Sequence, residues 1–192
     1  MIDPLLMRVI ACSSGLLLLL SAWHKFAAAD GFLVALGEYQ LLPAVLLRPA
    51  AMLLPALESS LGLAWLAGYA PETVAMLTAA LLTMYAAAIA INLRRGRAHI
   101  SCGCGFGGAS GGDQPLSWWL VARNLLLGAL ALLATLPATS RALGAYDWLT
   151  LALALAASGL LYAGASQLMR IAVAALGVAQ ARRTGRVPCR AG

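Results

Sequence analysis

The sequence predicts an all-α fold, namely a polytopic membrane helix bundle of four to five transmembrane helices. Hydrophobic residues make up 62% of the chain and charged residues only 10%, and the mean hydropathy is +0.86. Soluble domains carry about a quarter charged residues. A chain this apolar would expose large hydrophobic patches in water, so a lipid bilayer is the expected solvent.

Five segments are long enough to cross a bilayer core, which needs about 20 apolar residues of helix. They cover about residues 5–26, 43–69, 72–93, 117–136 and 146–169, with the last continuing as helix towards residue 181. Their apolar residues do not alternate with polar ones, as those of a membrane β-strand would. Residues 31–42 are less apolar and predict a short interfacial helix or a loop. We expect one membrane domain over residues 1–181 and a basic tail over residues 182–192.

Positive charges gather after the third and fifth segments. Arg94, Arg95 and Arg97 follow the third segment, and the tail carries a second group of arginines. The positive-inside rule places both groups in the cytoplasm. These arginines account for most of the net charge of +6, and no basic groove with interleaved aromatic residues accompanies them. A nucleic-acid partner is therefore not expected.

Two cysteines, Cys102 and Cys104, lie one residue apart in the loop between the third and fourth segments. Six of the ten residues from Gly103 to Gly112 are glycines, which leave the backbone unusually free. A disulfide across Cys-x-Cys closes a small, strained ring, and strained disulfides are the labile, catalytic kind. The nearby arginines favour the reactive thiolate. The loop predicts a redox dithiol, with Cys102 and Cys104 as its catalytic residues.

Two other interpretations of this loop stay open. His99, Cys102 and Cys104 are soft ligands suited to Cu(I) or zinc, although a closed zinc site needs four ligands and only three are local. Alternatively, the cysteines are incidental residues of a glycine-rich loop. Of the remaining cysteines, Cys12 is expected to be a small hydrophobe within the first helix and Cys189 a free thiol of the tail.

Charged residues inside the spans form the second group of candidates. Glu58 lies within the second segment, and Arg123 and Asn124 lie within the fourth. Intramembrane carboxylates are costly and usually face the bundle interior. Glu58 and Arg123 are expected to form a buried ion pair or a polar site for a quinone head group or a proton path. They are thus candidate cofactor-binding residues, with the cofactor itself left open. Lys25, at the end of the first segment, is explained by snorkelling towards the interface.

The loop and the segment after it resemble one protein family. Cys102–Gly107 followed by Gln114–Asn124 is similar to the methylamine utilisation family MauE, within the wider DoxX-like membrane proteins. Trp23-His24-Lys25, Glu38–Pro43 and Pro55–Glu58 fit the same family. The family's Cys-x-Cys maps onto the two loop cysteines. The sequence departs from the family where Gly105 separates Cys104 from Phe106, which leaves a divergent client open.

The resemblance implies a multi-pass protein of the bacterial inner membrane that supports the maturation of methylamine dehydrogenase. Its client would be the disulfide-rich β-subunit, and its partner a thioredoxin-like protein of the MauD kind. The expected function is a thiol–disulfide relay through Cys102 and Cys104, which would make the chain a thiol–disulfide oxidoreductase. A non-enzymatic scaffold or export factor is the alternative, and a metal-handling membrane protein a third. Periplasmic disulfide chemistry favours a loop outside the cell, whereas the charges favour the cytoplasm, so the face of the loop stays open.

Overall fold

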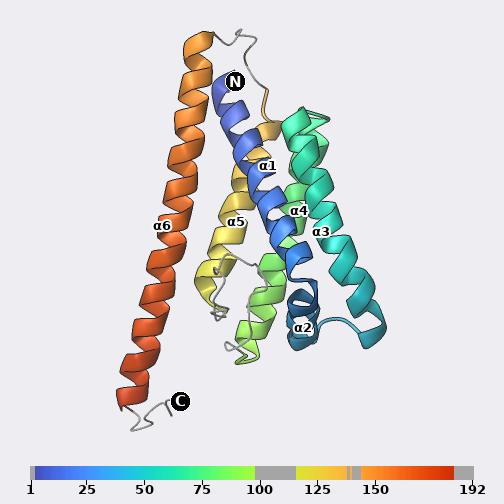
Figure 1. Cartoon of the computed structure of the whole chain (residues 1–192), viewed down its shortest axis with the longest axis vertical. Coiled ribbons are helices and arrows are strands. Elements are labelled where there is room, and N and C mark those ends of the chain that lie inside the picture. Colours follow the sequence, from blue (N-terminus) through green and yellow to red (C-terminus); the bar gives the residue numbers. More distant parts are fainter. Residues whose placement is uncertain (1–2, 98–115, 138, 140–143, 184–192) are drawn as a thin grey trace. The chain divides into compact units, whose positions relative to one another are not determined.

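The structure, a computed structural model, describes residues 3–97, 116–137, 139 and 144–183. Across this part of the chain, six α-helices and one 3₁₀ helix follow one another (Figure 1). Their bounds are α1 Pro4–Ala27, α2 Ala29–Tyr39, α3 Ala44–Ala67, α4 Pro71–Arg94, α5 Trp118–Leu132, η1 Leu133–Thr135 and α6 Ala145–Arg183. Five of them are long and apolar enough to cross a membrane: α1, α3, α4, α5 together with η1, and α6. The predicted all-α membrane bundle is confirmed.

The helix ends agree with the sequence to within a few residues. Asp3 caps α1 by accepting a hydrogen bond from the backbone N–H of Leu5 at 2.8 Å. Gly68 ends α3 in the left-handed conformation (φ 67°), which glycine adopts without steric cost. The less apolar stretch after α1 forms the short helix α2 rather than a loop.

The chain divides into two compact units, residues 1–155 and residues 156–192. The first unit contains α1–α5, η1 and the first part of α6, where Leu151 is buried. In the second unit the rest of α6 continues as helix to Arg183. The whole of α6 has 39 residues, far more than the roughly 20 that a bilayer core requires.

Within the first unit, the main packing pairs are α1 with α3 and α4 with α5. Two glycines allow α1 and α3 to approach closely. A Cβ atom on Gly15 would lie 3.0 Å from the carbonyl oxygen of Gly62, and one on Gly62 would lie 2.8 Å from Cγ of Leu19. Small residues at such crossings let helix backbones pack closely within membranes. The two helices therefore pack so closely that neither glycine position has room for a side chain.

A buried hydrogen bond joins α3 to α4. The indole Nε1 of Trp65 donates to Oγ1 of Thr78 at 3.0 Å, and both side chains are almost wholly buried. The replacement Thr78→Val keeps the shape and removes the acceptor. We expect it to lower the stability of the solubilised protein by about 1 kcal/mol, because the indole N–H is left unpaired. Thermal unfolding compared with Thr73→Val, an exposed threonine of the same helix, measures the loss. Equal unfolding temperatures for the two variants would contradict the expectation.

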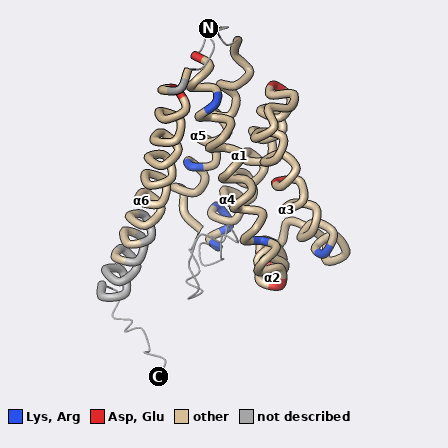
Figure 2. Tube along the Cα trace, turned by 45° about the horizontal axis from the view of Figure 1, so that its top comes forward, with Lys and Arg blue, Asp and Glu red and all other residues tan. Residues whose placement is uncertain are grey.

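Charged residues are sparse along α1–α5, as Figure 2 shows. The ends of α1 and α4 and the start of α3 and of α5 all lie at the end of the first unit where α2 packs (Figure 1). The described chain therefore stops at Arg97 and resumes at Leu116 at the α2 end of the unit. The cavity described below also lies at this end, because residues of α2 line it.

Candidate functional site

The described part of the membrane spans contains a buried ion pair between Glu58 of α3 and Lys25 of α1. Their exposed fractions are 1% and 4%. The Nζ atom of Lys25 donates a hydrogen bond to Oε1 of Glu58, so each charge neutralises the other away from water. An unpaired charge at the centre of a bilayer is costly, by roughly 3 kcal/mol on insertion scales. The pairing therefore offsets the cost of burying both charges inside the bundle.

Two hydroxyl groups extend the pair into a network of four side chains. Lys25 donates a second hydrogen bond to Oγ of Ser21 at 2.8 Å, one helical turn earlier in α1. The hydroxyl of Tyr85, from α4, donates to Oε1 of Glu58 at 2.8 Å, and Ser21 does so at 3.4 Å. One carboxylate oxygen therefore accepts from three helix-borne donors, while Oε2 is buried without a hydrogen-bond partner among the described residues. The network ties α1, α3 and α4 together through Glu58.

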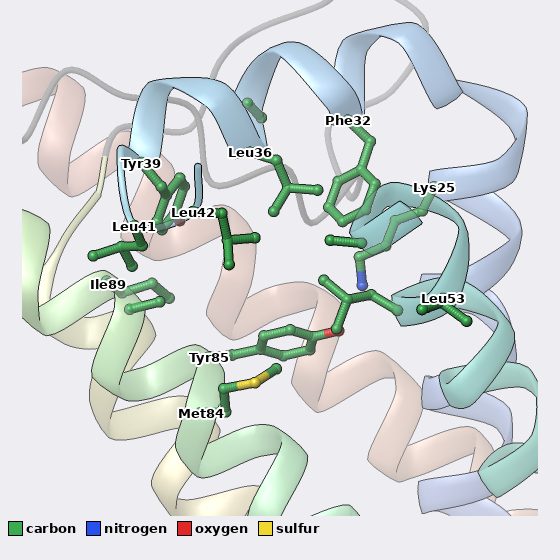
Figure 3. A pocket seen from close by; sticks show the side chains of 14 residues that line it. Lys25, Phe32, Leu36, Tyr39, Leu41, Leu42, Leu53, Met84, Tyr85 and Ile89 are labelled. Carbon is green, nitrogen blue, oxygen red and sulfur yellow. The ribbon is translucent and has the colours of Figure 1, made fainter. Parts of the chain in front are cut away.

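A cavity of about 430 Å³ lies beside this network. Lys25 forms its polar end, and the rings of Phe32, Tyr39 and Tyr85 form part of its wall (Figure 3). The Nζ atom of Lys25 lies 5.6 Å from the ring centroid of Phe32 and 5.0 Å from that of Tyr85. Almost all of the remaining wall is aliphatic and comes from α2, α3, α4 and the segment after α2.

Helical spacing explains how four elements build one cavity. On α2, Phe32, Ala35, Leu36 and Tyr39 follow the i, i+3, i+4, i+7 pattern of a single helix face. On α4, Tyr85, Ala88 and Ile89 do the same one turn apart. The short helix α2 thus covers a hollow between α1, α3 and α4 that would otherwise open at the end of the spans.

The structure corrects two expectations about the charges. Glu58 pairs with Lys25 and not with Arg123, so the expected Glu58–Arg123 pair is wrong. The reason is topological, because α1 packs along α3 and brings Lys25 to Glu58. Snorkelling of Lys25 is also wrong, since its ammonium group points into the bundle and is buried. Arg123 lies half-buried on α5 beside Asn124, which donates to the carbonyl of Leu120 at 2.9 Å.

Sequence reasoning missed Ser21, Lys25 and Tyr85 as members of the site. Two signals could have found them. Ser21 and Lys25 are four residues apart and so share one helix face. Tyr85 lies deep within a span, whereas membrane tyrosines favour the interfaces. A polar residue in that position needs a buried hydrogen-bond partner, and the second span offers Glu58.

The predicted redox and metal residues His99, Cys102 and Cys104 lie outside the described residues, as does Cys189. Where the chain resumes, Leu116 is 3% exposed and packs with Ile89 and Leu120, against which Tyr39 also packs. Ile89 and Tyr39 belong to the cavity wall. Leu116, where the described chain resumes, thus belongs to a hydrophobic cluster that includes residues of the cavity wall. Cys12 lies within α1, as the sequence predicts, and is a free, half-buried thiol.

Fold and site together define a multi-pass membrane protein that holds a buried ion pair between its helices. The family model described as methylamine utilisation protein MauE matches residues 3–137, which is well over half of the chain. The chain belongs to the MauE family of proteins involved in methylamine utilisation. The matched region contains α1–α5, the Lys25–Glu58 pair and the Cys102–Cys104 motif.

Individual relatives extend the similarity beyond this region. The methylamine utilization protein MauE of Paracoccus denitrificans is 34% identical over 186 residues, which cover 96% of this chain and 94% of the relative. The protein of the same name from Methylorubrum extorquens is 35% identical over 160 residues, or 82% of each chain. No solved structure matches the chain.

Proposed function

We propose that this protein supports the maturation of methylamine dehydrogenase by thiol–disulfide exchange at Cys102 and Cys104. The client is the disulfide-rich β-subunit, and the exchange partner is a thioredoxin-like protein of the MauD kind. Membership of the MauE family supports the pathway. The single observation that carries the mechanism is the Cys102-Gly103-Cys104 sequence in the connection between α4 and α5.

The exchange is a two-electron transfer with no net change in the number of disulfides. A thiolate of the partner attacks one sulfur of the Cys102–Cys104 disulfide, and the other cysteine leaves as a thiolate. The partner's second thiolate then attacks the mixed disulfide and releases the first cysteine. The partner ends oxidised, and Cys102 and Cys104 end reduced after taking up two electrons and two protons. The reverse sequence returns the electrons.

The cysteine pair is expected to be essential for maturation. The variant Cys102→Ser/Cys104→Ser should reduce the yield of disulfide-complete β-subunit by tenfold or more, because no exchange step survives the loss of both thiols. Thiol trapping after acid quench, followed by gel separation of the trapped forms, measures the redox state of the pair and of the client. Cys12→Ser is the matched control, because that free thiol lies within α1, and it should mature the client normally.

Two results would contradict the relay. One is that Cys102 and Cys104 stay fully reduced under every growth condition. The other is normal client maturation by the double serine variant together with loss of maturation when residues 103–112 are deleted. That second pattern would identify a non-enzymatic scaffold, in which the loop binds the client or its helper without exchanging electrons. An impermeant thiol reagent on intact cells would establish which face of the membrane the loop occupies.

A further inference from the structure

The cavity beside Lys25 has the size and wall chemistry of a small-molecule site. Its volume of about 430 Å³ falls in the range of roughly 300–1,000 Å³ that such sites occupy. Of the residues that line it, only Lys25, Tyr39 and Tyr85 carry polar side-chain atoms. The walls therefore favour a largely apolar molecule that reaches the site from the membrane.

The polar end of the cavity is the ammonium group of Lys25, which can donate one more hydrogen bond than it makes to Ser21 and Glu58. An ammonium group has three N–H donors. Ser21 and Glu58 accept two of those of Lys25, and among the described residues no acceptor takes the third. A buried donor without an acceptor is unfavourable, so a ligand oxygen at this position would complete the set. Because Glu58 already balances the charge of Lys25, the ligand can be neutral.

The aromatic wall adds a preference for shape. Phe32, Tyr39 and Tyr85 border the cavity, with Phe32 and Tyr85 on the sides next to the Lys25 ammonium group (Figure 3). Aromatic side chains stack favourably on other flat rings at centroid separations of about 4.5–7 Å. A flat ring with an oxygen at its edge would stack on these side chains and accept from Lys25 at the same time.

We propose that this cavity binds the head group of a neutral, lipid-soluble molecule that carries carbonyl oxygens on a flat ring, which is the chemistry of a membrane quinone. The carbonyl oxygen accepts from Lys25, the ring packs among the aromatic side chains, and the apolar tail lies along the aliphatic wall. A phospholipid head group fits less well, because its phosphate charge would meet a lysine that Glu58 already neutralises. The proposal concerns binding alone and is independent of the thiol relay.

A matched pair of probes tests the role of the carbonyl oxygen. The two probes are a tritiated naphthoquinone with a short alkyl tail and the naphthalene with the same tail. We expect saturable binding of the naphthoquinone to the purified protein in lipid nanodiscs at about one molecule per chain, measured by scintillation proximity. The naphthalene should bind roughly ten- to a hundredfold more weakly, because it cannot accept the hydrogen bond from the charged donor. Equal affinities would overturn the assignment of a carbonyl ligand.

A matched pair of variants tests the location. Ala88 lines the cavity, whereas Ala87 of the same helix is exposed and lies outside it. Ala88→Leu should lower naphthoquinone affinity at least tenfold by filling the cavity, and Ala87→Leu should leave it unchanged. Equal effects of the two variants, or displacement of the naphthoquinone by added phosphatidylglycerol at equal concentration, would contradict the proposal. Repeating the titration with Cys102→Ser/Cys104→Ser should give wild-type affinity, so failure of the relay leaves this test intact.

Discussion

The variant Lys25→Met is expected to destabilise the bundle by about 3–5 kcal/mol, the largest effect of any single substitution considered. It leaves Glu58 buried without its counter-charge, and breaking one side of a buried ion pair costs about this much. The network of Ser21 and Tyr85 would lose its centre at the same time, since both bond to groups of the pair. The unfolding temperature of the protein in detergent, followed by loss of helical circular dichroism, measures the effect.

The double variant Lys25→Met/Glu58→Gln separates charge from packing. Removing both charges leaves a neutral amide that can still accept from Tyr85. A buried ion pair replaced by neutral groups is often close to neutral in stability. We therefore expect the double variant to recover most of the loss, with a coupling free energy of about 2 kcal/mol or more in the double-mutant cycle. Additive effects of the two single substitutions would show that the pair does not hold the helices.

The variant Gly62→Val is expected to destabilise the α1–α3 crossing by about 3 kcal/mol, at the upper end of the range for overpacked sites. Even its Cβ atom would lie 2.8 Å from Cγ of Leu19 and 3.0 Å from the carbonyl oxygen of Gly15. The neighbour on one side is backbone and cannot rotate away, so the two helices must separate. Separation would also lengthen the Lys25–Glu58 contact, which joins the same pair of helices.

Gly128 of α5 provides the control for this prediction. A Cβ atom there would meet its nearest neighbours in α4 at 3.7 Å, which is ordinary van der Waals contact. Gly128→Ala should therefore be neutral or stabilising by up to about 1 kcal/mol, since alanine is the better helix former. The unfolding temperatures of Gly62→Val and Gly128→Ala, measured in the same detergent, test both expectations. A Gly62→Val protein as stable as Gly128→Ala would mean that the crossing is not closely packed.

The spans could be predicted from the sequence because length and hydropathy are local properties. A stretch such as residues 72–93 is apolar throughout, and lipid leaves a helix as the only way to satisfy its backbone. The observed helix, Pro71–Arg94, agrees at both ends because proline and arginine mark them. For residues 31–42 the sequence leaves both a helix and a loop open, because the apolar face of α2 covers a hollow that exists only after α1, α3 and α4 have packed.

The partner of Glu58 could not be predicted because it depends on which helices are neighbours. The sequence offers both Lys25 and Arg123 as cations, and the Coulomb attraction is the same for either. Packing decides between them, since the Gly15–Gly62 contact places α1 against α3. The cavity is equally hidden in the sequence, because its wall is assembled from segments far apart in the chain, such as Phe32 and Ile89.

The separation of Lys25 and Glu58 along the chain has a consequence for membrane insertion. The two residues are 33 positions apart and lie on the first and second spans, so the ribosome delivers the lysine first. Until α3 enters, Lys25 has no counter-charge and is best placed at the interface, to which its position at the end of α1 gives access. Glu58 lies near the middle of its span, so its short side chain cannot reach the interface. We therefore expect the lateral release of α3 from the translocon to be more favourable beside an α1 that is already present, because Lys25 then supplies the counter-charge of Glu58.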